Sequence, residues 1–253
     1  MIVLYTDFGV AGPYQGQVKA VLHQEAPAVP VSDLFANAPA HAPKAAAYLL
    51  GAYTGEFPEQ TVFLAVIDPG VGGIRAPGVL EADGRWFVGP DNGLFEVVAR
   101  RCDGTPQWWN ILWRPDRLSE TFHGRDLFAP IAARLARGET PRSGGDDFED
   151  TPLERIQRLD WPDDLAEIVY IDGFGNAMTG IRADTVPEDT ELSVAGQSVR
   201  RVKKFSDVSE GDLLCYENAN GLLEISVNQG RADEMLNLRI GCQVEFIKMR
   251  QGS

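Results

Sequence analysis

Residues 66–75, VIDPGVGGIR, mark the point where an apolar segment gives way to a glycine-rich turn. The segment before the turn, residues 61–67 (TVFLAVI), has five strongly apolar side chains in seven, which favours a strand buried on both faces. Pro69 has no backbone N–H to continue a strand ladder, and the glycines after it permit a sharp turn. Open α/β sheets bind ligands at the carboxyl ends of their strands, so Asp68 and Arg75 are candidate site residues. Asp-Pro-Gly is also common in turns without function, and only the other polar motifs decide between the two interpretations.

The sequence before this turn alternates between strand and helix patterns. Apolar strands are expected at residues 2–8 and 29–34, and apolar side chains recur at helical spacing in residues 14–26 and 43–54. A β-α-β-α-β order is typical of a sheet flanked by helices. We therefore expect an amino-terminal α/β domain, residues 1–142, with a mostly parallel sheet flanked by helices.

Four further elements are expected in this domain after the turn. Residues 78–90 favour a hairpin because an Asp-Gly pair, a strong turn signal, lies at their centre. A short helix is expected around Val97, and residues 108–113 form an apolar strand pattern. A last helical face includes Phe128 and is expected to end before Gly138.

Residues 143–164 are expected to form a linker, because the periodicity fades there and Gly, Pro and acidic residues predominate. Residues 165–253 then show short strand patterns separated by turn residues, which predicts an all-β, barrel-like carboxy-terminal domain. Its strands are expected at residues 167–171, 191–194, 198–202, 212–216, 222–227 and 243–248.

The composition is that of a soluble globular protein, since 44% of the 253 residues are hydrophobic and 24% are charged. The formal net charge of −14 argues against a nucleic-acid partner and is compatible with a cationic small substrate. No apolar run approaches the roughly 18 residues of a membrane span, and the amino terminus lacks a secretory signal pattern. A cytoplasmic protein without a membrane partner is expected. The three cysteines lack metal-site spacing and are expected to be reduced.

Of the three histidines, His123 has the most distinctive setting, between an aromatic residue and a glycine and directly before an Arg-Asp pair. A buried structural histidine is the alternative interpretation of His123. His23 lies in a helix pattern and His41 in a loop rich in Ala and Pro, and neither setting points to a function. The carboxylates are too widely spaced for a typical oxygen-ligand loop, so no metal site is predicted. Signatures of dinucleotide-binding, P-loop, serine-hydrolase and zincin sites are lacking.

Six motifs in order carry a family resemblance that spans almost the whole chain. They are TDFG at 6–9, DPGVGGIR at 68–75, GPDNG at 89–93, FHGRDLFAP at 122–130, DGFGN at 172–176 and NGLLEISVNQGRA at 220–232. Together they resemble the S-adenosyl-L-methionine (SAM) hydroxide adenosyltransferases, the SAM-hydrolase relatives of fluorinase and chlorinase.

The resemblance implies that water or hydroxide attacks the ribose 5′ carbon of SAM and gives adenosine and L-methionine. SAM is then the substrate, no cofactor or metal takes part, and the protein is a homotrimer with inter-subunit sites. The residues that match the water-positioning set are Asp68, Arg75 and His123. The residues that match substrate contacts are Asp7 (ribose hydroxyls), Asp172 (methionine amine), Phe174 and Asn176 (adenine side), Asn218 (near the methionine carboxylate) and Ala232 (a backbone contact to adenine).

The chain departs from the family pattern in four places, of which two are that Ile74 precedes Arg75 and that the region around Ala219 lacks a serine seen in halogenating relatives. Many relatives carry Asp-Ile-Thr/Ser-His after the second strand, whereas residues 33–36 read DLFA and lack the hydroxyl and the histidine. Relatives often have Asn where Gly180 follows Thr179. The three water-positioning residues are unchanged.

Three alternative functions remain open at this point. The first is a SAM-dependent halogenase that forms 5′-halo-5′-deoxyadenosine, although a carboxylate at position 68 would repel a halide. The second is a non-catalytic protein that binds SAM or adenosine without turnover. The third is a metal-dependent phosphoesterase, which would need a metal site that the spacing of the acids does not predict.

Overall fold

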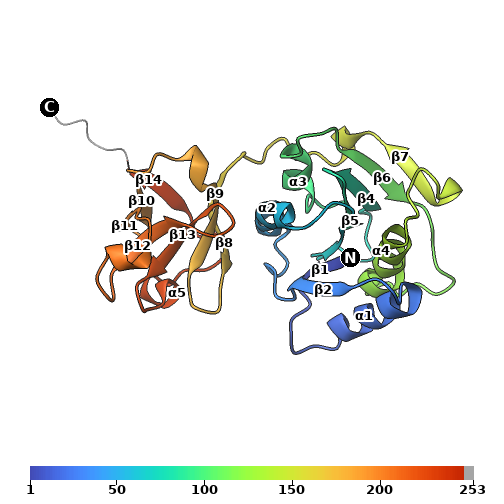
Figure 1. Cartoon of the computed structure of the whole chain (residues 1–253), viewed down its shortest axis with the longest axis horizontal. Coiled ribbons are helices and arrows are strands. Elements are labelled where there is room, and N and C mark those ends of the chain that lie inside the picture. The colour runs from blue at the N-terminus through green and yellow to red at the C-terminus, as the bar shows by residue number, and fades with distance from the viewer. Residues whose placement is uncertain (248–253) are drawn as a thin grey trace. The chain divides into compact units, whose positions relative to one another are not determined.

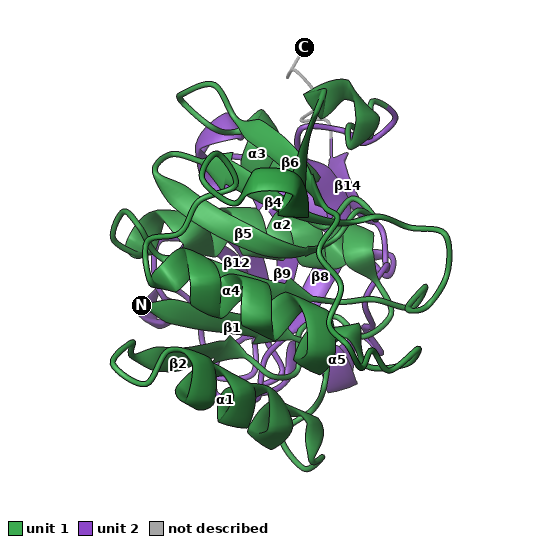
Figure 2. Cartoon of the chain, turned by 90° about the vertical axis from the view of Figure 1, so that its right-hand side faces the viewer, with its two compact units in different colours: residues 1–159 green, residues 160–253 purple. Residues whose placement is uncertain are grey.

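A computed structural model describes residues 1–247. The chain divides into two compact units, residues 1–159 and residues 160–253 (Figure 2). The strand expected at residues 243–248 is present as Val244–Ile247, and Lys248 lies outside the described residues. Part of the segment expected to be a linker, Phe148–Thr151, forms a strand of the first unit.

The first unit is built on a seven-stranded sheet with the order β2-β1-β3-β5-β4-β6-β7 (Figure 1). The strands in this order are Val31–Phe35, Ile2–Thr6, Val62–Val66, Arg85–Pro90, Pro77–Ala82, Gln107–Ile111 and Phe148–Thr151. The residues expected to form a doubly buried strand before the Asp-Pro-Gly turn form β3, which is buried throughout and has β1 and β5 as neighbours.

The sheet is mixed, which corrects the expectation of a mostly parallel sheet. β1, β2, β3 and β5 are parallel to one another, whereas β4, β6 and β7 pair with antiparallel neighbours. The expected hairpin is confirmed and explains the change of direction. Its turn residues Asp83 and Gly84 have φ angles of 46° and 69°, so β4 doubles back against β5.

Helices cover both faces of the sheet. Tyr14–Glu25 (α1) packs with Ala129–Ala136 (α4) on one face, and Pro43–Tyr53 (α2) packs with Glu96–Arg100 (α3) on the other (Figure 1). Alternate strand residues serve the two faces, as the period of two requires. Ile2 and Leu4 join the core beneath α1 and α4, while the Tyr5 hydroxyl donates to the Ala46 carbonyl of α2 at 2.8 Å.

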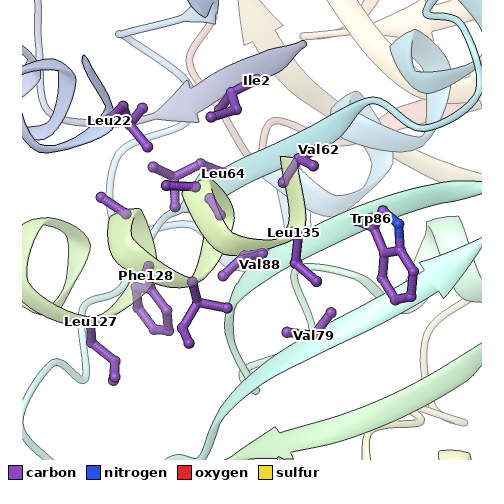
Figure 3. Packing of buried hydrophobic residues seen from close by; sticks show 14 of the residues in the cluster. Ile2, Leu22, Val62, Leu64, Val79, Trp86, Val88, Leu127, Phe128 and Leu135 are labelled. Atoms are coloured by element: carbon purple, nitrogen blue, oxygen red, sulfur yellow. The ribbon is translucent and has the colours of Figure 1, made fainter. Parts of the chain in front are cut away.

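One large core lies between the sheet and α4. Figure 3 shows side chains from β1, β3, β4 and β5 converging on the face of α4, with Phe128 at the start of the helix. Phe128 is fully buried, and the centre of its ring lies 6.5 Å from the centre of the His123 ring. Gly124–Phe128 forms a π-helical turn before α4, an irregularity that often marks functional sites and that the sequence did not predict.

The second unit is all-β apart from short helical turns. A four-stranded sheet has the order β12-β13-β9-β8, a three-stranded sheet has the order β11-β10-β14, and all pairs within them are antiparallel. The strands are Leu165–Ile171 (β8), Ala177–Arg182 (β9), Glu191–Val194 (β10), Gln197–Arg200 (β11), Leu213–Glu217 (β12), Leu222–Val227 (β13) and Val244–Ile247 (β14). The all-β character is confirmed, while β9 is a strand that the sequence did not predict.

Short helical segments complete the two units. They are the 3-10 turns Thr54–Glu56, Gly145–Asp147, Leu153–Arg155, Ala183–Thr185 and Phe205–Asp207, and the helix Ala232–Met235 (α5). None of the helices within residues 1–247 is long and apolar enough to cross a membrane.

Candidate active site

The Asp-Pro-Gly turn brings Asp68 and Arg75 face to face. Arg75 Nε donates to Asp68 Oδ1 at 3.1 Å, and Arg75 Nη2 donates to Asp68 Oδ2, so the ion pair is bidentate. Only 4% of the Asp68 side chain and 10% of the Arg75 side chain are exposed. In this geometry each Asp68 carboxylate oxygen accepts one hydrogen bond from Arg75 and keeps a lone pair for another donor.

Glycine allows the turn to close. Gly72 has φ +76° and lies so near the Glu120 carbonyl that an added Cβ would approach its oxygen to 2.4 Å. The turn therefore packs against the segment that carries His123, and only a residue without a side chain fits at this point.

His123 completes a cluster of three polar groups. Its Nδ1 lies 2.9 Å from Arg75 Nη2, and a guanidinium can only donate, so Nδ1 accepts this hydrogen bond. Neutral His123 therefore carries its ring hydrogen on Nε2. Burial, followed by the charge of Arg75, lowers the pKa of His123 below its ordinary value and favours this neutral form. The Arg75 guanidinium also packs 5.3 Å from the centre of the Phe128 ring, which fixes it from below.

Asp7 lies beside this cluster at the end of β1. It lines a cavity of about 100 Å³ together with Asp68 and His123. The other lining residues are Phe8, His41, Val66, Val71, Thr121, Phe122 and Gly124. The cavity is small and has both apolar and polar walls, so it could hold a water molecule and part of a sugar next to Asp68.

His41 is a cavity residue that the sequence analysis missed. Its backbone N–H donates to Asp7 Oδ2 at 3.1 Å, and its φ of 56° is unusual for a residue other than glycine. The chain thus orients the Asp7 carboxylate with a strained backbone segment, a device often found at functional sites. The only feature of the sequence that could have pointed to His41 was its location in the loop between the carboxyl end of β2 and the start of α2.

An aromatic cluster forms one wall of the cavity. The ring centres of Phe8 and Phe122 lie 5.7 Å apart, and Tyr14 lies 6.1 Å from Phe8 and 5.3 Å from Phe122. Val10, two residues after Phe8, is 85% exposed, and Ile74, directly before Arg75, is fully exposed. Apolar side chains on these loops suit a ligand with an apolar or aromatic face.

In the second unit, Asp172 organises the loop of the DGFGN motif. Its Oδ1 accepts the backbone N–H groups of Phe174 and Asn176, both at 2.9 Å, and its Oδ2 accepts the Asn176 side-chain amide at 3.1 Å. This network leaves the Phe174 ring 78% exposed. A rigid loop with a free aromatic ring can stack against a planar ligand.

Ala232 lies next to this loop at the start of α5. The backbone N–H of Asp233 donates to the Gly175 carbonyl at 3.0 Å, and Arg231 Nη1 donates to the Gly173 carbonyl at 2.9 Å. Ala232 is fully buried as a whole residue, backbone included, and it packs in the core of the second unit. Four of the residues predicted in this unit, Asp172, Phe174, Asn176 and Ala232, therefore belong to one local structure.

Asn218 has a different setting. Its side-chain oxygen accepts the backbone N–H groups of Asn220 and Leu222, both at 3.0 Å, and its amide donates to Glu224 Oε2 at 2.9 Å. These bonds leave one amide hydrogen for a ligand. Glu224 is almost completely buried, and burial raises its pKa. Asn218 also lines a cavity of about 420 Å³ in which Arg201 pairs with Glu217 and Lys203 with Glu188.

Within residues 1–247, no group of three or more His, Cys, Asp or Glu side chains is arranged to hold a metal ion. The polar cluster of the first unit contains one histidine and one carboxylate beside a guanidinium, and a nearby cation would meet the charge of Arg75.

Two family models match the chain. Residues 2–145 match the SAM hydroxide adenosyltransferase N-terminal domain, and residues 166–245 match the C-terminal domain of the same family. The (R)-S-adenosyl-L-methionine hydrolase of Thermus thermophilus is 38% identical, over 97% of this chain and 99% of the relative. The fluorinase of Actinopolyspora mzabensis is 26% identical, over 76% of this chain and 78% of that enzyme. A crystal structure of an uncharacterized conserved protein from Thermotoga maritima has a TM-score of 0.81 at 31% identity, covering 98% of this chain and all of that one.

Proposed function

Since the chain belongs to the SAM hydroxide adenosyltransferase family, we propose that it hydrolyses SAM to adenosine and L-methionine. The observation that carries the proposal is the contact of Asp68, Arg75 and His123 beside a small cavity. The two family matches together span most of both units, and curated relatives at 29–38% identity over nearly the whole chain bear the name SAM hydrolase. The fluorinases are more distant in sequence.

The chemistry requires little acid–base work from the protein. The sulfonium makes the 5′ carbon electrophilic, and methionine leaves with the electron pair of the broken C5′–S bond as a neutral thioether. The oxygen of water forms the new bond to C5′, and one water proton passes to a base and then to solvent. The main tasks are to align the water with the C–S bond and to remove its competing hydration.

Asp68 suits the role of proton acceptor. Arg75 pairs with it in a bidentate contact, and each carboxylate oxygen retains a lone pair that can accept a hydrogen bond from water. His123 suits the role of a donor that orients the water, because its Nδ1 is occupied by Arg75 and its ring hydrogen is on Nε2. Asp7, which the His41 N–H holds, is the proposed acceptor for the two ribose hydroxyls.

The remaining substrate contacts are proposed for the second unit. Asp172 would face the methionine amine, and Phe174 and Asn176 the adenine side. Asn218 retains one amide hydrogen for the methionine carboxylate. The backbone of Ala232 would contact adenine.

The test is incubation of the purified protein with SAM, followed by chromatography of the products. We expect adenosine and L-methionine in equal amounts, and Asp68→Asn should abolish most of their formation while SAM binding persists. Recovery of intact SAM after long incubation, with binding seen by calorimetry, would instead identify a non-catalytic SAM-binding protein. Formation of 5′-halo-5′-deoxyadenosine in preference to adenosine when halide is supplied would identify a halogenase.

We also propose a homotrimer with inter-subunit sites. The first-unit cavity of about 100 Å³ is smaller than the roughly 300 Å³ at the low end of small-molecule sites, so further walls must come from elsewhere. A cyclic trimer could supply them from a neighbouring chain. Inactive Asp68→Asn chains co-refolded with inactive Asp172→Ala chains should then regain activity. No recovery at any ratio, with trimers verified by light scattering, would contradict inter-subunit sites.

A barrel-like second unit is proposed on two isolated bridges. Glu167 in β8 pairs with Gln243, which directly precedes β14, and Arg201, which directly follows β11, pairs with Cys215 in β12. These bridges lie at both edges of the two sheets, which supports closure. The absence of a cofactor and the cytoplasmic location stay predictions, and metal analysis of the active protein and cell fractionation would test them.

A further inference from the structure

The GPDNG turn, residues 89–93, touches both ends of the loop that carries Asp68 and Arg75. The side-chain amide of Asn92 donates to the carbonyl of Ile67, the residue before Asp68, at 2.8 Å. The backbone N–H of Asp91 donates to the carbonyl of Ala76, the residue after Arg75, also at 2.8 Å. The two hydrogen bonds therefore fix the points where the loop leaves β3 and where it returns toward β4.

Besides these two bonds, the loop is held by the Asp68–Arg75 pair itself and by the close approach of Gly72 to the Glu120 carbonyl. Its internal backbone hydrogen bonds are short-range, from Val71 N–H to the Asp68 carbonyl at 3.2 Å and from Gly73 N–H to the Gly70 carbonyl at 3.0 Å. Ile74 is fully exposed and does not anchor the tip of the loop, whereas Val71 is partly buried and lines the cavity. The anchored ends, together with these contacts, define the position of the ion pair.

The GPDNG turn is itself held firmly enough to act as an anchor. Asn92 Oδ1 accepts the Leu94 N–H at 3.3 Å, and the Glu96 N–H donates to the Gly93 carbonyl at 3.0 Å at the start of α3. Arg158 Nη2 donates to Asp91 Oδ1 at 3.1 Å, a half-buried ion pair. The turn thus connects β5, α3 and residue 158 to the loop.

We propose that Asn92 is a positioning residue for the hydrolytic reaction. It holds the Asp68–Arg75 pair in place beside the cavity and, through Arg75, also holds the His123 ring. The inference rests on the proposed function for its kinetic consequences only. Its structural consequence, the placement of Arg75 against His123, exists without substrate.

The kinetic arm compares Asn92→Ala with Asn110→Ala. Asn110 lies in β6 and bonds Trp108 and Glu149, not the loop, so it is a matched loss of an amide. We expect kcat to fall about tenfold to 100-fold in N92A, with KM for SAM changed less than about threefold, because a displacement near 1 Å can cost this much. N110A should retain the wild-type kcat.

Asn92→Asp separates the two bonds of the side chain. A carboxylate can still accept the Leu94 N–H, but it cannot donate to the Ile67 carbonyl. N92D should therefore be as slow as N92A if the bond to Ile67 positions the loop. An N92D enzyme with wild-type kcat would overturn the proposal, since the turn alone would then be sufficient.

The structural arm needs no substrate. Arg75 and burial together lower the pKa of His123, so loosening the loop should move it upward, toward its ordinary value of 6.5. Proton NMR titration can follow His123 among only three histidines, with His123→Gln for assignment. A higher pKa in N92A than in N110A supports the proposal, and equal values overturn it. If the wild-type protein forms no adenosine, the proposed function fails, while this titration still decides the role of Asn92.

Discussion

Replacing Arg75 with alanine should destabilise the first unit far more than removal of a surface charge. The side chains of Asp68 and Arg75 are 4% and 10% exposed, so Arg75→Ala leaves a carboxylate buried without its partner. Loss of one member of a buried pair costs about 3–5 kcal/mol of unfolding free energy. We expect the low end, about 3 kcal/mol, because the neighbouring cavity admits water to the freed carboxylate.

A double variant makes this prediction specific. Asp68→Ala combined with Arg75→Ala removes both charges and should therefore be more stable than Arg75→Ala alone, with a coupling energy of about 2 kcal/mol. Urea unfolding followed by tryptophan fluorescence is the assay. Four of the five tryptophans lie in the first unit, so the signal reports mainly on that unit. In a thermal scan the single variant should lose about 6–12 °C.

The reasoning would be refuted by either of two results. A loss below about 0.5 kcal/mol in Arg75→Ala would mean that the pair behaves as an exposed ion pair. Additive losses in the double variant would mean that the two side chains act independently, which contradicts their bidentate contact.

Three further outcomes are expected from the site. Asp7→Ala should raise KM for SAM about tenfold or more with a smaller effect on kcat, because each hydrogen bond to a charged acceptor contributes about 1.5–3 kcal/mol. Steady-state kinetics that show an unchanged KM would contradict this role of Asp7. Activity should fall on the acid side only below pH 6.5, the ordinary pKa of histidine, because burial and the charge of Arg75 lower the pKa of His123 and keep it neutral to lower pH. A midpoint above pH 6.5 in the pH–rate profile would exclude His123 as the group responsible. Exhaustive dialysis against EDTA should leave kcat unchanged, and loss of activity restored by a divalent cation would show a metal requirement.

Much of the first unit could be predicted because its local signals are strong. The apolar run before Asp68 forms β3, and the Asp83-Gly84 pair makes the hairpin. Outside the predicted hairpin, strand direction could not be predicted, because apolar runs in parallel and antiparallel strands look alike. The expectation of a mostly parallel sheet was therefore wrong, since β6 and β7 also pair with antiparallel neighbours.

The second unit shows how packing overrides a local signal. Residues 177–182, AMTGIR, contain a glycine that weakens a strand pattern, and they were not expected to form β9. In the structure Gly180 lies so close to Leu165 that an added Cβ would approach the Leu165 Cβ to 2.7 Å. Glycine is required there by the neighbouring strand, information that a short window of sequence does not contain.

Some residues of the candidate site could likewise be found from the sequence, and others could not. Asp68 was found from its place at the end of an apolar strand, and Arg75 and His123 from their motifs, and the three lie in contact. His41 was missed because its contribution is a backbone N–H in a left-handed conformation, which its side chain does not reveal. Asn92 is part of the GPDNG motif, but its bond to Ile67 joins residues 25 apart in sequence and can be recognised only in the folded chain.

The most direct test of the central claim is hydrolysis of SAM in water enriched in ¹⁸O. If water attacks the 5′ carbon, mass spectrometry will find one ¹⁸O atom per adenosine, on the 5′ hydroxyl, and unlabelled L-methionine in equal amount. Intact SAM after prolonged incubation, or adenosine that carries no ¹⁸O, would contradict hydrolysis at this site.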